Sequence, residues 1–269
     1  MLQIARLSPK QLGDSAALVS GFFHSQMNAD GAFGDRAGAS DLYYTVFGLD
    51  GLIALGEKPP EATEAFLNTF GNGAGLDFVH LCCLIRCWAS FGKIAPVHPA
   101  RLAEQLASGN AYSAFLAYAA YQDLKQPIPS PERLLALLQT LRAEDGGYSN
   151  LPNQTIGLTP PTAAAAALFR QLGEEYPAGL AEWLLARCHA NGGFHAAPFS
   201  PIPDLLSTAV ALHALAGMKV PIYEIQEPCL DFVDSLWTNS GAFYGNWLDD
   251  TKDCEYTYYG LLALGHLSL

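Results

Sequence analysis

The chain has 269 residues, of which 50% are hydrophobic and 15% are charged, and its formal net charge is −12. Its 14 basic residues are spread thinly, which excludes a basic surface for nucleic acid, and no apolar run reaches the roughly 18 residues that cross a membrane. Met1 to Ser20 lacks the basic start and apolar core of a signal peptide, and the six cysteines are unevenly spaced, so we expect reduced thiols and a cytoplasmic location.

Six apolar segments follow one another along the chain, and each begins after a short polar residue that suits the N-cap of a helix. These N-cap candidates are Asp41, Asp77, Asn110, Thr159, Asp204 and Asp253. Glycine closes most of the segments and proline follows soon after, a stop signal because glycine adopts the left-handed cap and proline cannot continue a helix. The closing glycines are Gly56, Gly92, Gly173, Gly217 and Gly265. The pattern predicts buried helices over residues 42–55, 78–91, 111–124, 160–172, 205–216 and 254–264.

Amphipathic stretches alternate with these apolar segments, as the one-sided spacing of Leu134, Leu138 and Leu141 illustrates. They predict a second set of helices over residues 10–27, 61–70, 97–107, 131–143, 178–190 and 224–237. The resulting order is amphipathic helix, turn and apolar helix, repeated six times. Few strands are expected, because no stretch alternates convincingly between apolar and polar residues.

A turn with glycine and an aromatic residue precedes four of the apolar helices. Its copies are Asp30-Gly31-Ala32-Phe33, Asp145-Gly146-Gly147-Tyr148, Asn191-Gly192-Gly193-Phe194 and Ser240-Gly241-Ala242-Phe243. The aromatic residues of the last three copies are 46 and 49 residues apart, and a period of this size indicates stacked supersecondary units. The sequence therefore predicts an all-α fold, an α-α toroid or (α/α)6 barrel of six helical hairpins, as one domain over residues 1–269. An open solenoid of helix pairs is the alternative.

These repeats resemble the protein prenyltransferase β-subunit family and the squalene/terpene cyclase superfamily, which share the α-α toroid. The segments Gly193-Phe194 with Asp204 to Thr208, and Gly241-Ala242-Phe243 with Asp253 to Tyr258, carry the likeness. The resemblance covers nearly the whole chain. It implies a central cavity that holds an isoprenoid, a transferase or cyclase activity, a zinc or magnesium cofactor, and a helical α-type partner subunit.

The zinc ligands of this family are an Asp, a Cys two residues later and a His on the next inner helix. Asp204 matches the Asp, whereas Leu206 stands at the Cys position and Tyr256 at the His position. Leu206 has no donor atom and zinc prefers His to Tyr, so we predict no metal site of the family type. Of the family's basic residues that hold a diphosphate, only Lys252 remains.

Four carboxylates stand at the start of the last apolar helix: Asp249, Asp250, Asp253 and Glu255. Crowded carboxylates have raised pKa values, which suits a proton donor, and a ligand set for a metal and a diphosphate is a second functional interpretation. The structural interpretation is a solvated acidic loop with Asp253 as helix cap, and Asp204 has the same ambiguity. By resemblance, Asp204, Asp253 and Tyr256 are the predicted catalytic residues.

His80, Cys83 and Cys87 fall on one face of a predicted helix. His80 and Cys87 are about 10 Å apart along that helix, so packing of buried thiols is favoured over a shared metal. Aromatic residues are numerous on the apolar helices, and in a toroid they would line a cavity and stabilise carbocations. Tyr44, His80 and Tyr112 are the predicted cavity residues, with Tyr256 beside them.

Three functions are open from the sequence. The first is an enzyme that binds an isoprenoid and transfers or cyclises it. The second is a non-catalytic lipid-binding or scaffold subunit, because the metal ligands and the basic residues of the family are missing. The third is a glycosidase that uses Asp204 and Asp253, which the small number of tryptophans disfavours. The expected partners are an apolar small molecule or isoprenoid and a helical α-type subunit, but not nucleic acid.

Overall fold

The computed structural model describes residues 1–103, 106 and 109–269 of the chain. The described residues are mainly helical, which confirms the all-α class, and they divide into two compact units. Unit 1 comprises Met1–Pro99, Asp123–Lys125 and Asp234–Leu269, and unit 2 comprises Ala100–Gln122 and Gln126–Val233. A single domain over residues 1–269 stays a prediction.

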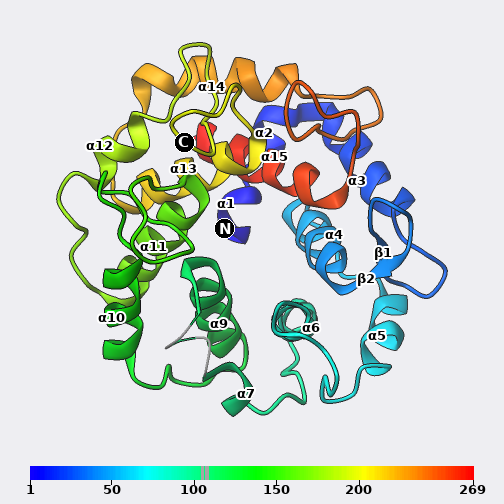
Figure 1. Cartoon of the computed structure of the whole chain (residues 1–269). Helices are drawn as coiled ribbons and strands as arrows, with labels where there is room; N and C mark the ends of the chain where they lie inside the picture. The colour runs from blue at the N-terminus through cyan, green and yellow to red at the C-terminus, as the bar shows by residue number, and fades with distance from the viewer. Residues whose placement is uncertain (104–105, 107–108) are drawn as a thin grey trace. The chain divides into compact units, whose positions relative to one another are not determined.

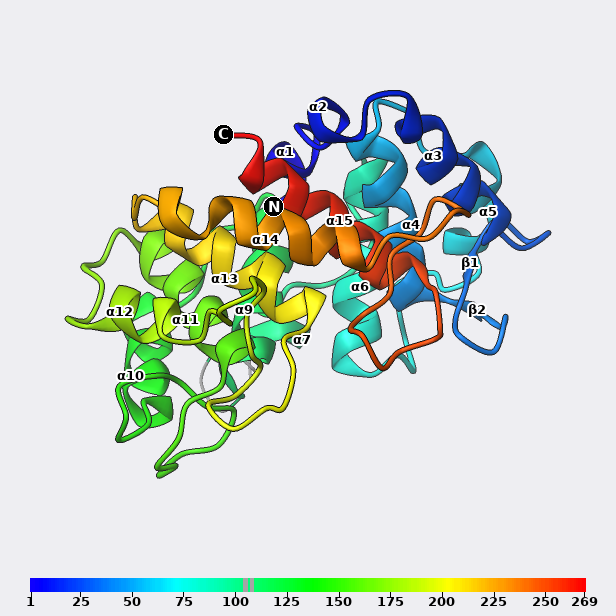
Figure 2. The same ribbon diagram turned by 90° about the horizontal axis from the view of Figure 1, so that it is seen from above.

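Unit 1 is built around three apolar helices, of which α4 packs against both α15 and α6 (Figure 1, Figure 2). The short helix α1 packs on α4 and α15, while α3 packs on α4 and α5 packs on α6. The bounds are α1 Leu2–Ala5, α2 Pro9–Leu12, η1 Gly13–Ser15, α3 Ala16–Ser25, α4 Leu42–Ala54, α5 Glu61–Asn68, α6 Phe78–Ser90 and α15 Cys254–Leu267. Helix α1 was not predicted, and the predicted helix 10–27 is divided into α2, η1 and α3.

Unit 2 has α11 and α13 packed side by side, with α12 against α13 (Figure 1). The helices here are α7 Ala100–Ala103, α9 Ala111–Asp123, α10 Pro131–Leu141, α11 Thr159–Leu172, α12 Leu180–Leu185, α13 Leu205–Gly217 and α14 Tyr223–Ser235. The last residue of α9 and the last two of α14 belong to unit 1. Helix α7 lies in the predicted segment 97–107, of which residues 104, 105 and 107 lie outside the described residues together with residue 108.

Five of the six predicted N-caps are confirmed. Each accepts a hydrogen bond from the backbone N–H three residues later, at 2.7 to 2.9 Å, and these caps are Asp41, Asp77, Asn110, Asp204 and Asp253. The prediction for Thr159 was wrong, since the N-cap of α11 is Leu158 and makes no side-chain cap bond. The hydroxyl of Thr159 instead donates to the carbonyl of His195 at 2.5 Å.

The predicted helix stops are correct where glycine follows the helix and wrong where it lies inside one. Gly173 caps α11 with a φ of 74°. Helix α15 continues past Gly265 to Leu267. A Cβ on Gly265 would lie 2.1 Å from the carbonyl oxygen of Ile4, so this glycine permits the close approach of α1. Gly217 is the last residue of α13, and Lys219 rather than this glycine has a positive φ, of 59°.

In each copy of the repeated turn, the aromatic residue is buried and is hydrogen-bonded to a threonine of the apolar helix that follows. Phe33, Tyr148, Phe194 and Phe243 are at most 2% exposed. Their backbone N–H groups donate to the hydroxyls of Thr45, Thr162, Thr208 and Thr257 in that order, at 2.8 to 3.4 Å. Around the first copy, the strands β1 Phe33–Gly34 and β2 Ser40–Asp41 form an antiparallel hairpin that was not expected. A strand of two residues is too short to show a regular alternation of apolar and polar residues, so the sequence pattern did not reveal the hairpin.

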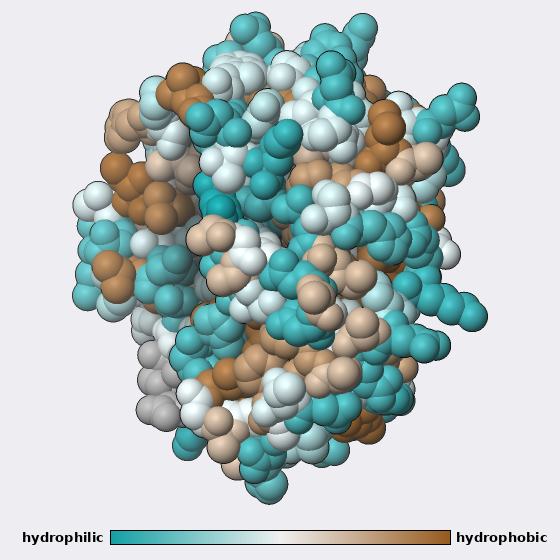
Figure 3. All heavy atoms as spheres, turned by 90° about the vertical axis from the view of Figure 1, so that its right-hand side faces the viewer, coloured by the Kyte–Doolittle hydropathy of each residue, from teal (hydrophilic) through white to brown (hydrophobic). Residues whose placement is uncertain are grey.

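The amphipathic helices expose their polar sides, as predicted. In α5 the buried residues are Thr63 and Leu67, whereas Glu61 is exposed. The surface on the side of α5 and the β1–β2 hairpin mixes hydrophilic with apolar residues (Figure 3). Among the described residues we find no helix with both the length and the apolarity of a membrane span.

Candidate active site

The first part of the site is an ion pair between the β1–β2 hairpin and the start of α15 in unit 1. The Nε of Arg36 donates to Asp253 Oδ2 at 2.8 Å, and a terminal nitrogen donates to Asp249 Oδ2 at 3.2 Å. Asp253 is only 2% exposed. The guanidinium carbon also lies 5.4 Å from the centroid of the Tyr256 ring, a cation–π distance. Arg36 thus links two predicted catalytic residues, Asp253 and Tyr256.

Glu255 is the carboxyl group with the most altered environment at this site. Burial raises its pKa to about 7, and the charge of Asp253 adds to this effect, while Tyr43 and Arg36 oppose it. The hydroxyl of Tyr43 donates to Glu255 Oε1 at 2.6 Å. The other oxygen, Oε2, has no hydrogen-bond partner in the described part of the chain. A carboxyl group that is partly protonated near neutral pH can donate a proton from this oxygen.

Aromatic side chains of α4 and α15 continue from Glu255. The ring of Tyr43 lies 5.7 Å from that of Tyr44 and 5.0 Å from that of Phe47, which in turn lies 5.6 Å from Tyr259. All four rings belong to half-buried residues. Burial raises the pKa of Tyr44, and the charges of Asp253 and Glu255 raise it further. The predicted cavity residue Tyr44 therefore lies close to the carboxyl groups of this site.

His80 lies at the start of α6 between two helix caps. Its Nδ1 is 2.7 Å from Asp77 Oδ2, and its Nε2 is 3.2 Å from Asp41 Oδ2. Burial lowers the pKa of His80, but the hydrogen bonds and charges of Asp77 and Asp41 raise it above the usual value. Asp41 also caps α4 through the N–H of Tyr44. His80 is thus connected through one carboxylate to the helix that carries Tyr44.

The two other predicted site residues, Asp204 and Tyr112, belong to unit 2. Asp204 caps α13, and burial raises its pKa, while its hydrogen bonds to Ser207 and the charge of His195 oppose the rise. Tyr112 is 39% exposed near the start of α9. The structure therefore brings Asp253, Tyr256 and Tyr44 together in one unit and places Asp204 and Tyr112 in the other.

The residues at the family's metal positions do not fit zinc. Asp204 is occupied as a helix cap, and Leu206 offers no donor atom. Magnesium fits the carboxylates of α15 no better, because Asp249 and Asp253 already accept the hydrogen bonds of Arg36. Among the described residues, no group of three or more His, Cys, Asp or Glu side chains is arranged to hold a metal ion.

Of the structural interpretation, the helix cap at Asp253 is confirmed, but the solvated loop does not hold for three of the four carboxylates at the start of α15. Asp253 is buried, and Glu255 and Asp249 are half-buried; only Asp250 is exposed. Asp249 and Asp253 are covered by Arg36. The sequence did not reveal this partner, because a single arginine in a loop belongs to no motif. A sequence signal that could have drawn attention to Arg36 is its position three residues after Phe33, in the loop that follows the first Gly-aromatic turn. Lys252, the basic residue that the family resemblance singled out for a diphosphate, donates to the hydroxyl of Ser240 at 3.2 Å.

The cysteines agree with the prediction of buried thiols. Cys83 and Cys87 are 7% and 0% exposed, and all six cysteines are free. Burial raises the pKa of Cys87 well above its usual value, which keeps the thiol protonated and weakly reactive. Cys188 is half-buried, so it departs from the pattern of the other five.

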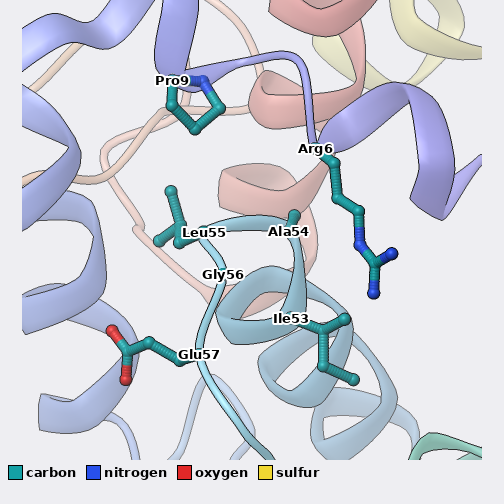
Figure 4. Close-up of a pocket in the computed structure, with 7 residues that line it drawn as sticks. All are labelled: Arg6, Pro9, Ile53, Ala54, Leu55, Gly56 and Glu57. Atoms are coloured by element: carbon teal, nitrogen blue, oxygen red, sulfur yellow. The ribbon is translucent and has the colours of Figure 1, made fainter.

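A pocket of about 300 Å³ lies at the opposite end of α4 from the candidate site (Figure 4). Arg6 and Pro9 line it on one side, and residues 53–57 at the end of α4 line it on the other. Glu57 points away from Arg6 and binds Ser20 and His24 instead, the latter at 2.8 Å. Helix α4 has 13 residues and is therefore about 20 Å long. The pocket is too far away to contribute to the chemistry of Glu255.

The described residues form helical hairpins in which the Gly-aromatic turns precede apolar helices, and the residues of the candidate site lie at or near the N-termini of such helices. A family model described as the prenyltransferase alpha-alpha toroid domain matches residues 2–103 and 162–268. The chain therefore belongs to the prenyltransferase α-α toroid family, which confirms the resemblance and the toroid fold. No curated protein matches the sequence.

Proposed function

We propose that the chain binds an isoprenoid or another apolar chain along the aromatic side chains of α4 and α15, and that Glu255 acts on it as a general acid. The observation that carries this proposal is the Glu255 carboxyl group, with its pKa of about 7 and its unpartnered Oε2. General acids work best when their pKa is close to the working pH. The family match supports an apolar ligand.

The reaction begins with transfer of the Glu255 proton to an oxygen of the ligand. The carbon–oxygen bond then breaks, the electron pair leaves with the oxygen, and Glu255 remains as a carboxylate. The carbon atom becomes a carbocation beside Tyr43, Tyr44 and Phe47, whose π faces stabilise positive charge. Transfer to an acceptor or cyclisation follows from this intermediate. An alcohol or epoxide fits this chemistry better than a diphosphate, because the Arg36 guanidinium is already bound to two carboxylates.

Asp253 and Tyr256 have supporting roles in this proposal, since both contact Arg36. Asp253 holds Arg36 and caps α15, and its charge helps to raise the pKa of Glu255. Tyr44 and His80 lie at the N-terminal ends of α4 and α6, where the ligand would enter beside Glu255. Asp204 and Tyr112 belong to unit 2, and their catalytic and ligand-binding roles require separate tests with D204N and Y112A.

A non-catalytic lipid-binding or scaffold subunit is the second candidate. It is favoured by the poor fit of the family's metal positions and by the engagement of Arg36 with Asp253 and Asp249. A lipid-binding subunit would bind the same apolar chain as the enzyme, and the two differ in whether Glu255 transfers a proton.

The acid role predicts that E255Q lowers turnover by about 100-fold or more, because a positioned general acid contributes that much. Purified protein would be incubated with farnesol, an epoxide of farnesol and farnesyl diphosphate, and products followed by mass spectrometry. Glu61→Gln makes the same chemical change on an exposed side chain of α5 and should leave turnover unchanged. Binding of farnesol without consumption of any compound would contradict the acid role and support the lipid-binding candidate.

The pH dependence of turnover gives an independent check on Glu255. The acid must be protonated, so activity should fall as the pH rises through about 7. The hydrogen bond from Tyr43 lowers the pKa of Glu255, and Y43F removes that bond. We therefore expect the alkaline limb of the rate profile to move to higher pH in Y43F. An unchanged limb would show that another group controls this part of the profile.

A further inference from the structure

The third Gly-aromatic turn packs directly against α14 within unit 2. Cys188 follows α12 and pairs with Phe194 in an antiparallel bridge across this turn. An added Cβ on Gly192 would lie 1.8 Å from the carbonyl oxygen of Pro228 and 2.7 Å from the backbone nitrogen of Cys229. The turn and α14 therefore touch through backbone atoms, which fixes Cys188 and Cys229 relative to each other.

Two thiols meet at this contact. The thiol of Cys188 donates a hydrogen bond to Cys229 Sγ, and the backbone N–H of Gly193 donates to the same sulfur. The bond between the thiols, together with burial, raises the pKa of Cys188. The same bond lowers the pKa of Cys229 against the effect of burial, and Gly193 lowers it further. Cys188 Sγ also lies 3.6 Å from the carbonyl oxygen of His189. The two sulfur atoms are thus in contact without being bonded, since both cysteines are free.

The two thiols differ in their access to solvent. Cys188 is half-buried, whereas Cys229 is 0% exposed. The remaining cysteines are buried, and burial raises the pKa of each: Cys82, Cys83, Cys87 and Cys254. Thiols that are buried and protonated react slowly. An oxidant in solution therefore reaches Cys188 first, and Cys229 is the neighbouring thiol that can complete a disulfide.

We propose that Cys188 and Cys229 form a redox-active dithiol, which a low-molecular-weight disulfide of the glutathione type converts to a disulfide. Cys188 attacks one sulfur of oxidised glutathione while its proton passes to Cys229 through their hydrogen bond, which yields a mixed disulfide and one glutathione thiolate. Cys229 then attacks the Cys188 sulfur, and the second glutathione leaves with the Cys229 proton. The two cysteines lose two electrons, and oxidised glutathione gains them.

The disulfide would bond α14 covalently to the turn that holds the start of α13. The backbone N–H of Asp204, the cap of α13, donates to the carbonyl of Phe194 in this turn at 3.1 Å. A bond between Cys188 and Cys229 closes a loop of about 40 residues, and we expect the oxidised chain to melt about 5–10 °C higher than the reduced one. The proposal requires neither an apolar ligand nor proton transfer by Glu255.

The test is to incubate the full folded chain with oxidised glutathione, block the remaining thiols with iodoacetamide, and digest it for mass spectrometry. We expect two peptides joined through Cys188 and Cys229. C229A should stop the reaction at a glutathione adduct on Cys188, whereas C188A should give neither product. C82A is the matched control, because it removes a buried thiol of α6 and should still form the disulfide.

The wild-type result needs no variant, so the proposal stays testable if C229A does not fold. Dithiothreitol should restore the six thiols of the wild type and return its melting temperature to the initial value. A glutathione adduct that persists on Cys188 of the wild type would overturn the dithiol, because Cys229 would then be unable to attack it. A disulfide between other cysteines, or a chain that stays fully reduced, would overturn it as well.

Discussion

Replacement of Gly192 with alanine is expected to destabilise the chain by about 3–5 kcal/mol, among the largest effects of a single substitution. Gly192 has a φ of 82°, and an added Cβ would lie 1.8 Å from the carbonyl oxygen of Pro228 in α14. Backbone atoms cannot rotate away as the end of a side chain can, so α14 itself has to shift. Denaturant unfolding followed by circular dichroism measures the loss.

Gly146 provides the matched control for this prediction. It occupies the same position in another copy of the turn and has a φ of 92°, but an added Cβ would meet no atom within 4 Å. G146A therefore introduces only the backbone strain of a left-handed residue, about 1–2 kcal/mol. Equal losses in G192A and G146A would show that the contact of the turn with α14 is unimportant.

Replacement of Arg86 with methionine should lower the free energy of unfolding at pH 7 by about 3–5 kcal/mol, because it leaves the buried carboxylate of Asp50 without a partner. Arg86 of α6 donates to both oxygens of Asp50 of α4, at 2.8 and 3.1 Å, and lies 3.4 Å from an oxygen of Asp123. Asp50 is 7% exposed, and burial already raises its pKa above the usual 3.8 in the intact chain, against the effect of Arg86. Arg133 of α10 is exposed, and R133M should change the stability little.

The pH dependence of R86M follows from the same carboxyl group. Loss of Arg86 raises the folded-state pKa of Asp50 further above its unfolded value, so the folded chain takes up a proton more readily than the unfolded one. The defect should therefore shrink as the pH falls from 8 toward 5, and D50N in the R86M background should recover much of the loss at pH 7. A defect that is constant over this range would assign the loss to packing instead.

The sequence predicted the candidate site only in part. Asp253 was recognised as a helix cap within an acidic cluster, and Tyr256 through the family resemblance. Tyr44 was recognised because aromatic residues on the apolar helices of a toroid would line its cavity. Glu255 was named within an acidic cluster, but its protonation depends on burial and on the hydroxyl of Tyr43, more than 200 residues earlier in the chain. Arg36 and the Asp50–Arg86–Asp123 cluster were missed, because their partners come from separate helices and hairpins.

The sequence by itself determined the order of the helices and most of their boundaries. These follow from local signals, such as the cap at Asp41 and the stop at Gly173, whose effects extend over one helical turn. Tertiary structure alone decided that Gly265 continues a helix, that Thr159 is not a cap, and that Arg36 neutralises Asp253. The physical reason is that burial and ion pairing depend on distances between residues that are far apart in the chain, which no local pattern records.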